Sequence, residues 1–388
     1  MSAREPSILH VVGLIADRYG GPPRNVRDVT SALTAAGHRV VGLTTDRDGH
    51  GRLSDAARRA LARDPEWVIA RVPTRGPALS PGFAAAARRL VAGADVVHLH
   101  GIYSPAAAVA GLIARRAGVP YVLQLHGAAT DYDYARKRWK KEPYDVLVQR
   151  RLIADAAAVL AMTEMEAEQG KRAFPAATMR IVPPPVVADA AVPGSADGGG
   201  HDGRTVGFLA RLSEKKGAPI LLAAFALIAD EFPDARLVVA GPDDEGIGAA
   251  MSRDVERLGL GGRVSFPGMV VGREKAEMLA GFDVFALPSA DESFGIAVVE
   301  AMNAGVPVVI TDEVAIAADV VAAEAGLSAS RTAEGFAAAL ARLLGDPAAA
   351  AAMGSAGRRL AVERYSRTAA VDALMRVYRE AIAPAPIA

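Results

Sequence analysis

Short apolar runs alternate with longer, alanine-rich segments along the whole chain. The runs are rich in Val, Ile and Leu, as strands buried on both faces of a parallel sheet are, and the intervening segments have a helical period. This repetition predicts an α/β fold with two Rossmann-like, doubly wound parallel sheets. The first series comprises Ile8–Leu14, Val40–Thr44, Val68–Val72, Val96–His100, Tyr121–His126 and Val159–Thr163. The second comprises Thr205–Ala210, Leu237–Gly241, Val264–Pro267, Val284–Pro288 and Pro307–Thr311.

A stretch rich in glycine, alanine and aspartate follows three prolines, Pro183–Pro185, and separates the two series. Residues 186–203 show no apolar period and predict a linker. We therefore expect an N-terminal domain over residues 1–185 and a C-terminal domain over residues 204–364, which a chain of 388 residues is long enough to form. Residues 365–388 should add a terminal helix that packs back on the N-terminal domain. Its apolar positions recur at helical spacing: Ala370, Leu374, Val377, Tyr378 and Ala381.

Composition excludes several classes of protein. Lysine plus arginine and aspartate plus glutamate number 44 each, so the charge gives no sign of a nucleic-acid partner. The lack of cysteine excludes disulfides, thiol nucleophiles and cysteine-ligated zinc. No run approaches the roughly 18 apolar residues of a membrane-spanning helix. His10 interrupts the first apolar run, which we interpret as a buried strand rather than a signal peptide, and we expect a cytoplasmic protein.

The densest basic cluster surrounds Trp139. Two interpretations remain open for it: a solvated surface, or a contact with anionic lipid headgroups or a diphosphate-lipid acceptor. The second would make the protein a peripheral one at the inner face of the membrane. The cluster comprises Arg136, Lys137, Arg138, Lys140 and Lys141.

The strongest local motif is DESFGIAVVEAMNAGVPVV, residues 291–309. A helix beginning near Gly295 would present free backbone N–H groups to a phosphate or to sugar hydroxyls, and glycine would allow a close approach. Glu300, two turns into that helix, could accept hydrogen bonds from a ribose diol. The alternative is that Glu300 is a solvated helix residue and Glu292 an acid favoured by the helix dipole.

A second motif, GFLARLSEKKG, covers residues 207–217. A buried strand ends here and a basic loop precedes a helix. Arg211 and Lys216 could neutralise a diphosphate, the first through two parallel hydrogen bonds and the second as a compact charge. We interpret Lys215 as a residue of the surface turn.

The two motifs, about eighty residues apart, together resemble the glycosyltransferase family 4 pattern on the GT-B fold. The N-terminal segment ADRYGGPPRNVRDVTSALTAAGHRV is similar to that family's glycine loop, and HLHGIYSP, YVLQLHGAATD and RRLIADAAAVLAMTEMEAE follow in the family's order. The chain departs from the family in Pro183–Pro185 at the hinge, in TDEVAIAADVV over residues 311–321, and at Arg367. The resemblance implies two facing domains with the active site in the cleft between them.

The resemblance also implies roles for single residues. Arg211 and Lys216 would hold the donor diphosphate and stabilise the departing nucleoside diphosphate. Glu300 would bind the donor ribose, Glu292 the transferred sugar, and His126 would face that sugar from the other domain. The implied catalytic residues are His126, Arg211, Lys216 and Glu292. The implied donor-binding residues are Gly20, Gly21, Arg211, Lys216, Glu292, Ser293, Phe294, Gly295, Ile296 and Glu300.

Histidines and tyrosines supply the acceptor-binding candidates, His100, Tyr103 and Tyr132; Tyr134 could also stack on an acceptor sugar. His98 and His100 share one face of a predicted strand, and we expect His98 to be buried and hydrogen-bonded. A His-x-His metal site needs a third ligand, which the sequence alone does not reveal. We therefore expect no metal and no cofactor beyond the nucleotide-sugar donor, since no Asp-x-Asp motif follows a strand.

The sequence thus favours a retaining hexosyltransferase. The family implies mannose, glucose or N-acetylglucosamine, transferred from a GDP- or UDP-sugar to a glycan or lipid-linked acceptor of surface polysaccharide or glycolipid biosynthesis. Two alternatives remain open: a nucleotide-sugar epimerase of the same fold, and a non-catalytic carbohydrate-binding protein of two domains. A nicotinamide dehydrogenase is disfavoured because no Gly-x-Gly-x-x-Gly follows an early strand.

Overall fold

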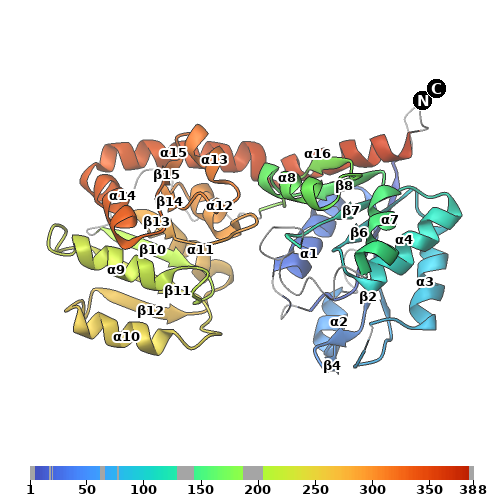
Figure 1. Cartoon of the computed structure of the whole chain (residues 1–388), viewed down its shortest axis with the longest axis horizontal. Coiled ribbons are helices and arrows are strands. Elements are labelled where there is room, and N and C mark those ends of the chain that lie inside the picture. Colours follow the sequence, from blue (N-terminus) through green and yellow to red (C-terminus); the bar gives the residue numbers. More distant parts are fainter. Residues whose placement is uncertain are drawn as a thin grey trace. The chain divides into compact units, whose positions relative to one another are not determined.

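The computed structural model describes residues 5–16, 19, 21–61, 66–76, 78–128, 144–186 and 204–383. The chain divides into two compact units (Figure 1). The first comprises Met1–Pro185 and Arg367–Ala388, and the second Val186–Ser366. Each unit contains one parallel sheet with helices on both faces.

The first unit is built on a seven-stranded sheet of order β5-β2-β1-β6-β7-β8-β9, in which every pair is parallel. All six apolar runs predicted for this half are strands of the sheet, while the short edge strand β9 was not predicted. The strands are β1 (Ser7–Val12), β2 (Arg39–Thr45), β5 (Glu66–Ala70), β6 (Val96–His100), β7 (Tyr121–Gln124), β8 (Ala158–Ala161) and β9 (Met179–Ile181).

Helices cover both faces of this sheet. Helices α3 (Pro81–Val91) and α4 (Pro105–Ala117) pack on one face, and α1 (Gly21–Ala35) and α16 (Arg367–Ile382) on the other. Serine N-caps followed by proline start α3 and α4. The remaining elements of this unit are the hairpin of β3 (Arg47–Asp48) and β4 (Gly51–Arg52), α2 (Asp55–Leu61), the π-helical turn η2 (Asp145–Gln149), α7 (Arg150–Ala154) and α8 (Glu164–Ala173).

Helix α16, red in Figure 1, belongs to the first unit although it ends the chain. Its apolar stripe is buried against β6, β7 and α1. Leu374 and Tyr378 are almost inaccessible to solvent and lie in one cluster with Ile8 and Val122. The helical spacing recognised in the sequence therefore marks the face by which α16 packs on this sheet.

The second unit contains a six-stranded sheet of order β12-β11-β10-β13-β14-β15. Helices α9 and α14 pack together on one face, and α12 and α15 on the other. The strands are β10 (Thr205–Leu209), β11 (Arg236–Ala240), β12 (Val264–Gly268), β13 (Val284–Leu287), β14 (Val308–Ile310) and β15 (Gly326–Ser328). The helices are α9 (Ala218–Ile228), α10 (Gly248–Arg257), α11 (Gly272–Ala280), α12 (Ile296–Asn303), α13 (Ala317–Ala322), α14 (Ala333–Gly345) and α15 (Pro347–Tyr365).

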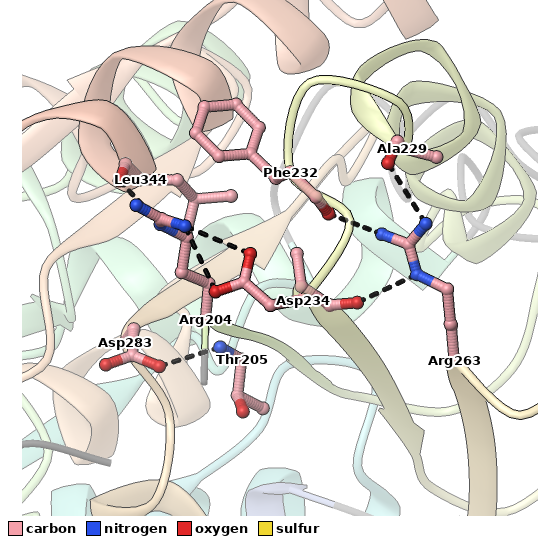
Figure 2. A network of polar contacts seen from close by, with 9 residues as sticks. Arg204, Thr205, Ala229, Phe232, Asp234, Arg263, Asp283 and Leu344 are labelled. Carbon is pink, nitrogen blue, oxygen red and sulfur yellow. Dashed lines mark hydrogen bonds and ion pairs between the residues drawn. The ribbon is translucent and has the colours of Figure 1, made fainter. Parts of the chain in front are cut away.

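A polar network joins the amino ends of four strands of the second sheet (Figure 2). Arg204 donates to both carboxylate oxygens of Asp234, at 3.0 and 3.1 Å. The Arg263 guanidinium donates to the carbonyl oxygens of Ala229, Phe232 and Ala235. These contacts anchor the turns at the edge opposite the loops described below, so they serve the fold.

Among the described residues, no single helix is both long enough and apolar enough to cross a membrane. The segments Ala333–Gly345 and Pro347–Ile382 are long and apolar enough only when taken together, and they meet at a bend of 102°.

Candidate functional site

The carboxyl ends of β10, β13 and β14 are neighbours in the second sheet, so the loops that follow them meet at one edge. Gly217, with a φ of +75°, ends the loop after β10; a Cβ there would lie 2.2 Å from the carbonyl oxygen of Pro288. The Ala290 N–H donates to the Lys215 carbonyl oxygen at 2.8 Å. The close approach of these two loops therefore requires a glycine at position 217.

Two ion pairs connect the same loops. Lys216 contacts Glu292, and the two side chains are only 16% and 21% exposed. Next to them Lys215 pairs with Asp291. The structure thus brings together two predicted donor-site residues that are 76 positions apart in the chain. Lys215, interpreted from the sequence as a residue of the surface turn, also pairs across the loops.

The loop after β14 holds Glu292 in place. The Glu292 N–H donates to the Glu313 carbonyl oxygen at 3.1 Å, and the Ala315 N–H donates to the Glu292 carbonyl oxygen at 2.9 Å. These residues belong to the TDEVAIAADVV segment, which departs from the family pattern. In this chain that segment therefore supports the acidic loop.

Helix α12 begins after Gly295, whose φ of +93° lies in the left-handed region. The N–H groups of Ile296 and Ala297 precede the first hydrogen bonds of the helix, which Val298 and Val299 donate to the Gly295 carbonyl oxygen, and they are suited to an anion or a hydroxyl. The Phe294 ring is buried against Tyr365, with ring centres 5.4 Å apart and an edge-to-face arrangement. The Phe294 side chain thus supports the fold, and only its backbone is suited to a ligand; Ser293 precedes it in the same loop.

Glu300 of α12 is not a solvated helix residue. Its carboxylate contacts the Lys275 ammonium of α11, and the two side chains are 10% and 9% exposed. Sequence reasoning missed Lys275. Its spacing of four residues from buried Leu279 is the signal that places it on the inward face of α11.

Arg211 lies apart from these pairs. Its side chain is 60% exposed, and its guanidinium is 3.7 Å from the Asp244 carboxylate. Lys215, Lys216 and Lys275 are each paired with an acid as well. The charge of these four cations is therefore nearly balanced by acids.

The first unit holds a buried histidine cluster. In the register of β1 and β6, His10 lies opposite His98, and His100 is two residues farther along the same face. The three side chains are 0%, 0% and 3% exposed. His98 is buried and hydrogen-bonded, as predicted: its Nδ1 lies 2.6 Å from the Tyr378 hydroxyl of α16. His100, expected to face an acceptor, instead has both ring nitrogens within hydrogen-bond distance of other histidines.

Ligand atoms of His10, His98 and His100 lie within 4.8 Å of one another. His10 is thus the third imidazole that the sequence did not reveal. However, His10 Nδ1 and His100 Nε2 are already 2.8 Å apart in a hydrogen bond. In the described part of the chain this group contains no carboxylate, so a divalent ion would place two uncompensated charges in the core. The residues fit a hydrogen-bonded network better than a metal site.

His126 follows β7 with a φ of +55°, a conformation that is strained for a residue other than glycine. Glu166, almost fully buried in the first turn of α8, fixes this turn because its carboxylate accepts the N–H groups of Gly127 and Met162. On the imidazole side, His126 Nε2 lies 3.0 Å from His100 Nδ1. Sequence reasoning missed Glu166, although Thr163 and Glu166 have the spacing of a capping box.

Burial keeps the histidine cluster neutral. It lowers the pKa of His10 to about 3 and that of His126 to about 4, and it holds the pKa values of His98 and His100 well below 6.5. The side chain of Gln124 raises the pKa of His98, against the larger effect of burial. Burial also raises the pKa of Glu166 to about 7, against the lowering effect of its two backbone hydrogen bonds.

The other predicted residues are placed as follows. Gly21 begins α1, and a Cβ there would meet nothing within 4 Å in the described part of the chain, so its role toward a donor stays a prediction. Tyr103 has a φ of +59°, and its hydroxyl donates to buried Asp145 at 3.3 Å. The predictions for Gly20, Tyr132, Tyr134 and the basic cluster around Trp139 lie outside the described residues.

Two family profiles match the chain: "Glycosyl transferases group 1" over residues 198–360 and "Glycosyl transferase 4-like domain" over residues 20–185. The D-inositol 3-phosphate glycosyltransferase of Saccharomonospora viridis is 31% identical over 308 residues, which are 74% of this chain and 70% of that protein. The phosphatidyl-myo-inositol mannosyltransferase of Mycolicibacterium smegmatis is 37% identical over 186 residues, which are 47% of this chain and 46% of that protein.

Among solved structures, Anabaena HepE in complex with UDP superimposes with a TM-score of 0.76 at 19% identity, covering 96% of this chain and 99% of that one. This likeness shows the GT-B fold predicted from the sequence, with two Rossmann-like units. Together with the two profiles and the Saccharomonospora relative, it establishes that the chain belongs to the group 1 glycosyltransferases.

Proposed function

We propose that the protein is a retaining hexosyltransferase whose second unit binds a nucleoside diphosphate sugar. The observation that carries this proposal is the contact of Lys216 with Glu292 at the carboxyl edge of the second sheet. A cation for the diphosphate and an acid for sugar hydroxyls are held there by loops that follow adjacent strands. Neither residue is isolated or fully solvated.

Donor binding exchanges the partners of this pair. The diphosphate presents a denser negative charge than one carboxylate, so Lys216 turns to it and releases Glu292 to accept hydrogen bonds from sugar hydroxyls. The N–H groups at the start of α12 add donors for the same ligand. Arg211 is exposed and weakly paired, so it can move to the diphosphate at little cost.

In this scheme the Glu300 carboxylate accepts hydrogen bonds from the ribose hydroxyls. Because Lys275 holds one of its oxygens, the carboxylate is fixed in direction before the nucleotide arrives. A carboxylate has further lone pairs for a diol. Lys275 thus orients a binding residue without needing to touch the ligand.

In the transfer step the bond between the anomeric carbon and the diphosphate oxygen breaks, and a bond to the acceptor oxygen forms. An oxygen of the departing diphosphate takes the proton that the acceptor hydroxyl loses, and the nucleoside diphosphate leaves with the bonding electrons. Lys216 and Arg211 stabilise the negative charge that develops on this leaving group, without a metal ion. His126 of the first unit contacts hydroxyls of the transferred sugar.

The relatives guide the choice of substrates. Two of them are named for transfer to inositol 3-phosphate and to phosphatidyl-myo-inositol. We therefore propose a phosphorylated polyol, free or lipid-linked, as the acceptor class. Hexoses carried by UDP or GDP are the donors, in line with the UDP complex of Anabaena HepE.

The test combines nucleotide binding with product analysis. Calorimetry should detect binding of UDP or GDP by the wild-type protein, at least tenfold weaker binding by Lys216→Met, and nearly unchanged binding by the matched control Lys215→Met. NMR of the product should show the donor's anomeric configuration. Epimerised sugar after incubation of donor alone would favour an epimerase, and equal binding by both lysine variants would refute the assigned site.

A further inference from the structure

A continuous chain of hydrogen bonds crosses the core of the first unit. It runs from the Tyr378 hydroxyl to His10 Nε2 (3.5 Å), from His10 Nδ1 to His100 Nε2 (2.8 Å), and from His100 Nδ1 to His126 Nε2 (3.0 Å). Tyr378, His10 and His100 are almost completely buried, whereas His126 is half-buried. This series of hydrogen bonds therefore leads from the interior to His126, the least buried of the four residues.

Every histidine-to-histidine link joins an Nδ1 to an Nε2. A neutral imidazole carries one N–H and one lone pair, and each link needs one of each. It follows that His10, His100 and His126 must all carry the proton on the same nitrogen. Only two arrangements satisfy the chain: Nδ1–H in all three, or Nε2–H in all three.

His98 decides between the two arrangements. Its Nδ1 bonds to the Tyr378 hydroxyl at 2.6 Å. Its buried Nε2 has no partner with hydrogen-bond geometry among the described residues; the Gln124 side chain, which raises the pKa of His98, does not meet that geometry. If Tyr378 donates to His98, the orphaned Nε2 carries a hydrogen, and a buried unsatisfied N–H is costly. If His98 donates to Tyr378, the orphan is a lone pair and the hydroxyl proton turns toward His10. In the second case His10, His100 and His126 all carry their proton on Nδ1.

We propose that His10, His100 and Tyr378 are positioning residues that hold His126 as its Nδ1–H tautomer. His126 then offers a hydrogen-bond donor, and not a base, at Nδ1, the ring nitrogen that takes no part in the hydrogen bonds between the histidines. Glu166 fixes the backbone of the same turn through the Gly127 N–H, so ring and backbone are set independently. The link to sugar recognition rests on the proposed function, whereas the coupling of tautomers does not.

The test is histidine ¹⁵N NMR of the full-length protein at pH 7, which reports the protonated nitrogen of each ring without any substrate. We expect Nδ1–H at all three positions, and a mixture of tautomers at His126 in His100→Phe. Tyr378→Phe, which keeps the packed ring, should weaken the Nδ1–H preference. His38→Asn changes a histidine that is not part of this series of hydrogen bonds and should leave the preference unchanged. Different tautomers at His100 and His126 would overturn the coupling, and Nε2–H throughout would overturn the donor assignment.

Kinetics then separate this inference from the proposed function. Once an active donor is known, His100→Phe and Tyr378→Phe should each lower kcat by roughly tenfold, the lower range for loss of a group that orients a functional imidazole. Nucleotide affinity should be unchanged, because the nucleotide is bound by the second unit. Coupled tautomers without transferase activity would refute the proposed function alone; uncoupled tautomers in an active enzyme would refute this inference alone.

Discussion

Acidification from pH 7 to 5.5 should destabilise the first unit, because its four clustered histidines are neutral in the folded state. Burial gives His10 a pKa of about 3 and His126 one of about 4, and the pKa values of His98 and His100 are also well below 6.5. The unfolded chain therefore binds more protons, and stability falls as the pH falls through 6.5. The groups around the cluster include Tyr378 of α16, Gln124 of β7 and Glu166 of α8.

The magnitude follows from the displaced pKa values. With an unfolded pKa of 6.5, each histidine costs about 1.2 kcal/mol over this interval, so the four together cost about 5 kcal/mol. Glu166 acts in the opposite direction, because its folded pKa of about 7 exceeds the ordinary 4.5. The stabilisation that Glu166 contributes is fully present below pH 4.5 and is lost as the pH rises through 7. Acidification from pH 7 to 5.5 therefore raises the free energy of unfolding by about 1.5 kcal/mol through this group. The net loss of about 3.5 kcal/mol is a large share of a typical domain stability of about 5–15 kcal/mol.

Urea unfolding followed by tryptophan fluorescence isolates this effect. Both tryptophans, Trp67 and Trp139, lie in the first unit, and Trp67 is buried. Six of the seven histidines also lie there, at positions 10, 38, 50, 98, 100 and 126. In His10→Phe the loss between the two pH values should be smaller by about 1.2 kcal/mol, since one displaced pKa is gone. A free energy of unfolding that changes by less than about 1 kcal/mol in the wild-type protein would refute the neutral cluster.

Three further predictions concern the second unit. Lys275→Met should lower its unfolding free energy by about 3 kcal/mol, since Glu300 keeps a buried charge without its cation, and Lys275→Met with Glu300→Gln should recover most of it in chemical denaturation. Arg263→Ala should cost about 1–3 kcal/mol by removing donors from three carbonyl groups, with nucleotide affinity unchanged in calorimetry. Gly217→Ala should lower both stability and nucleotide affinity, because the new Cβ would push the Lys216 loop away from Pro288; a variant with wild-type affinity would show that this loop is not part of the site.

The fold was predictable to the extent that burial leaves a local pattern. Strands covered on both faces are continuous apolar runs, and all eleven predicted runs correspond to strands of the two sheets. The strands that were missed are short or lie at sheet edges. Met179–Ile181 is only partly buried, and Gly326–Ser328 has a single large apolar residue, so neither has the pattern of a central strand.

The sequence predicted which loops form the site of the second unit, but not which of their charged side chains form ion pairs. The two motifs located Lys216, Glu292 and Glu300, because glycines and charges after buried strands are visible in the sequence. The cation that each acid meets depends on how elements 25 to 76 residues apart are placed, which no local pattern encodes. Lys275 could have been suspected only from its place beside Leu279 on the inward face of a helix.

His10 shows what a local pattern can and cannot determine. In the sequence it only interrupts an apolar strand, yet the alternation of side chains along β1 already places it on the same buried face as Ile8. A polar side chain on such a face needs a partner, and the neighbouring strand is the nearest source of one. The strand order makes β6 that neighbour, and the register sets His98 opposite His10. An isolated histidine within a buried run is therefore a reason to look for a second histidine at the matching position of each candidate neighbour, and in this chain Val96–His100 is the predicted strand that offers two.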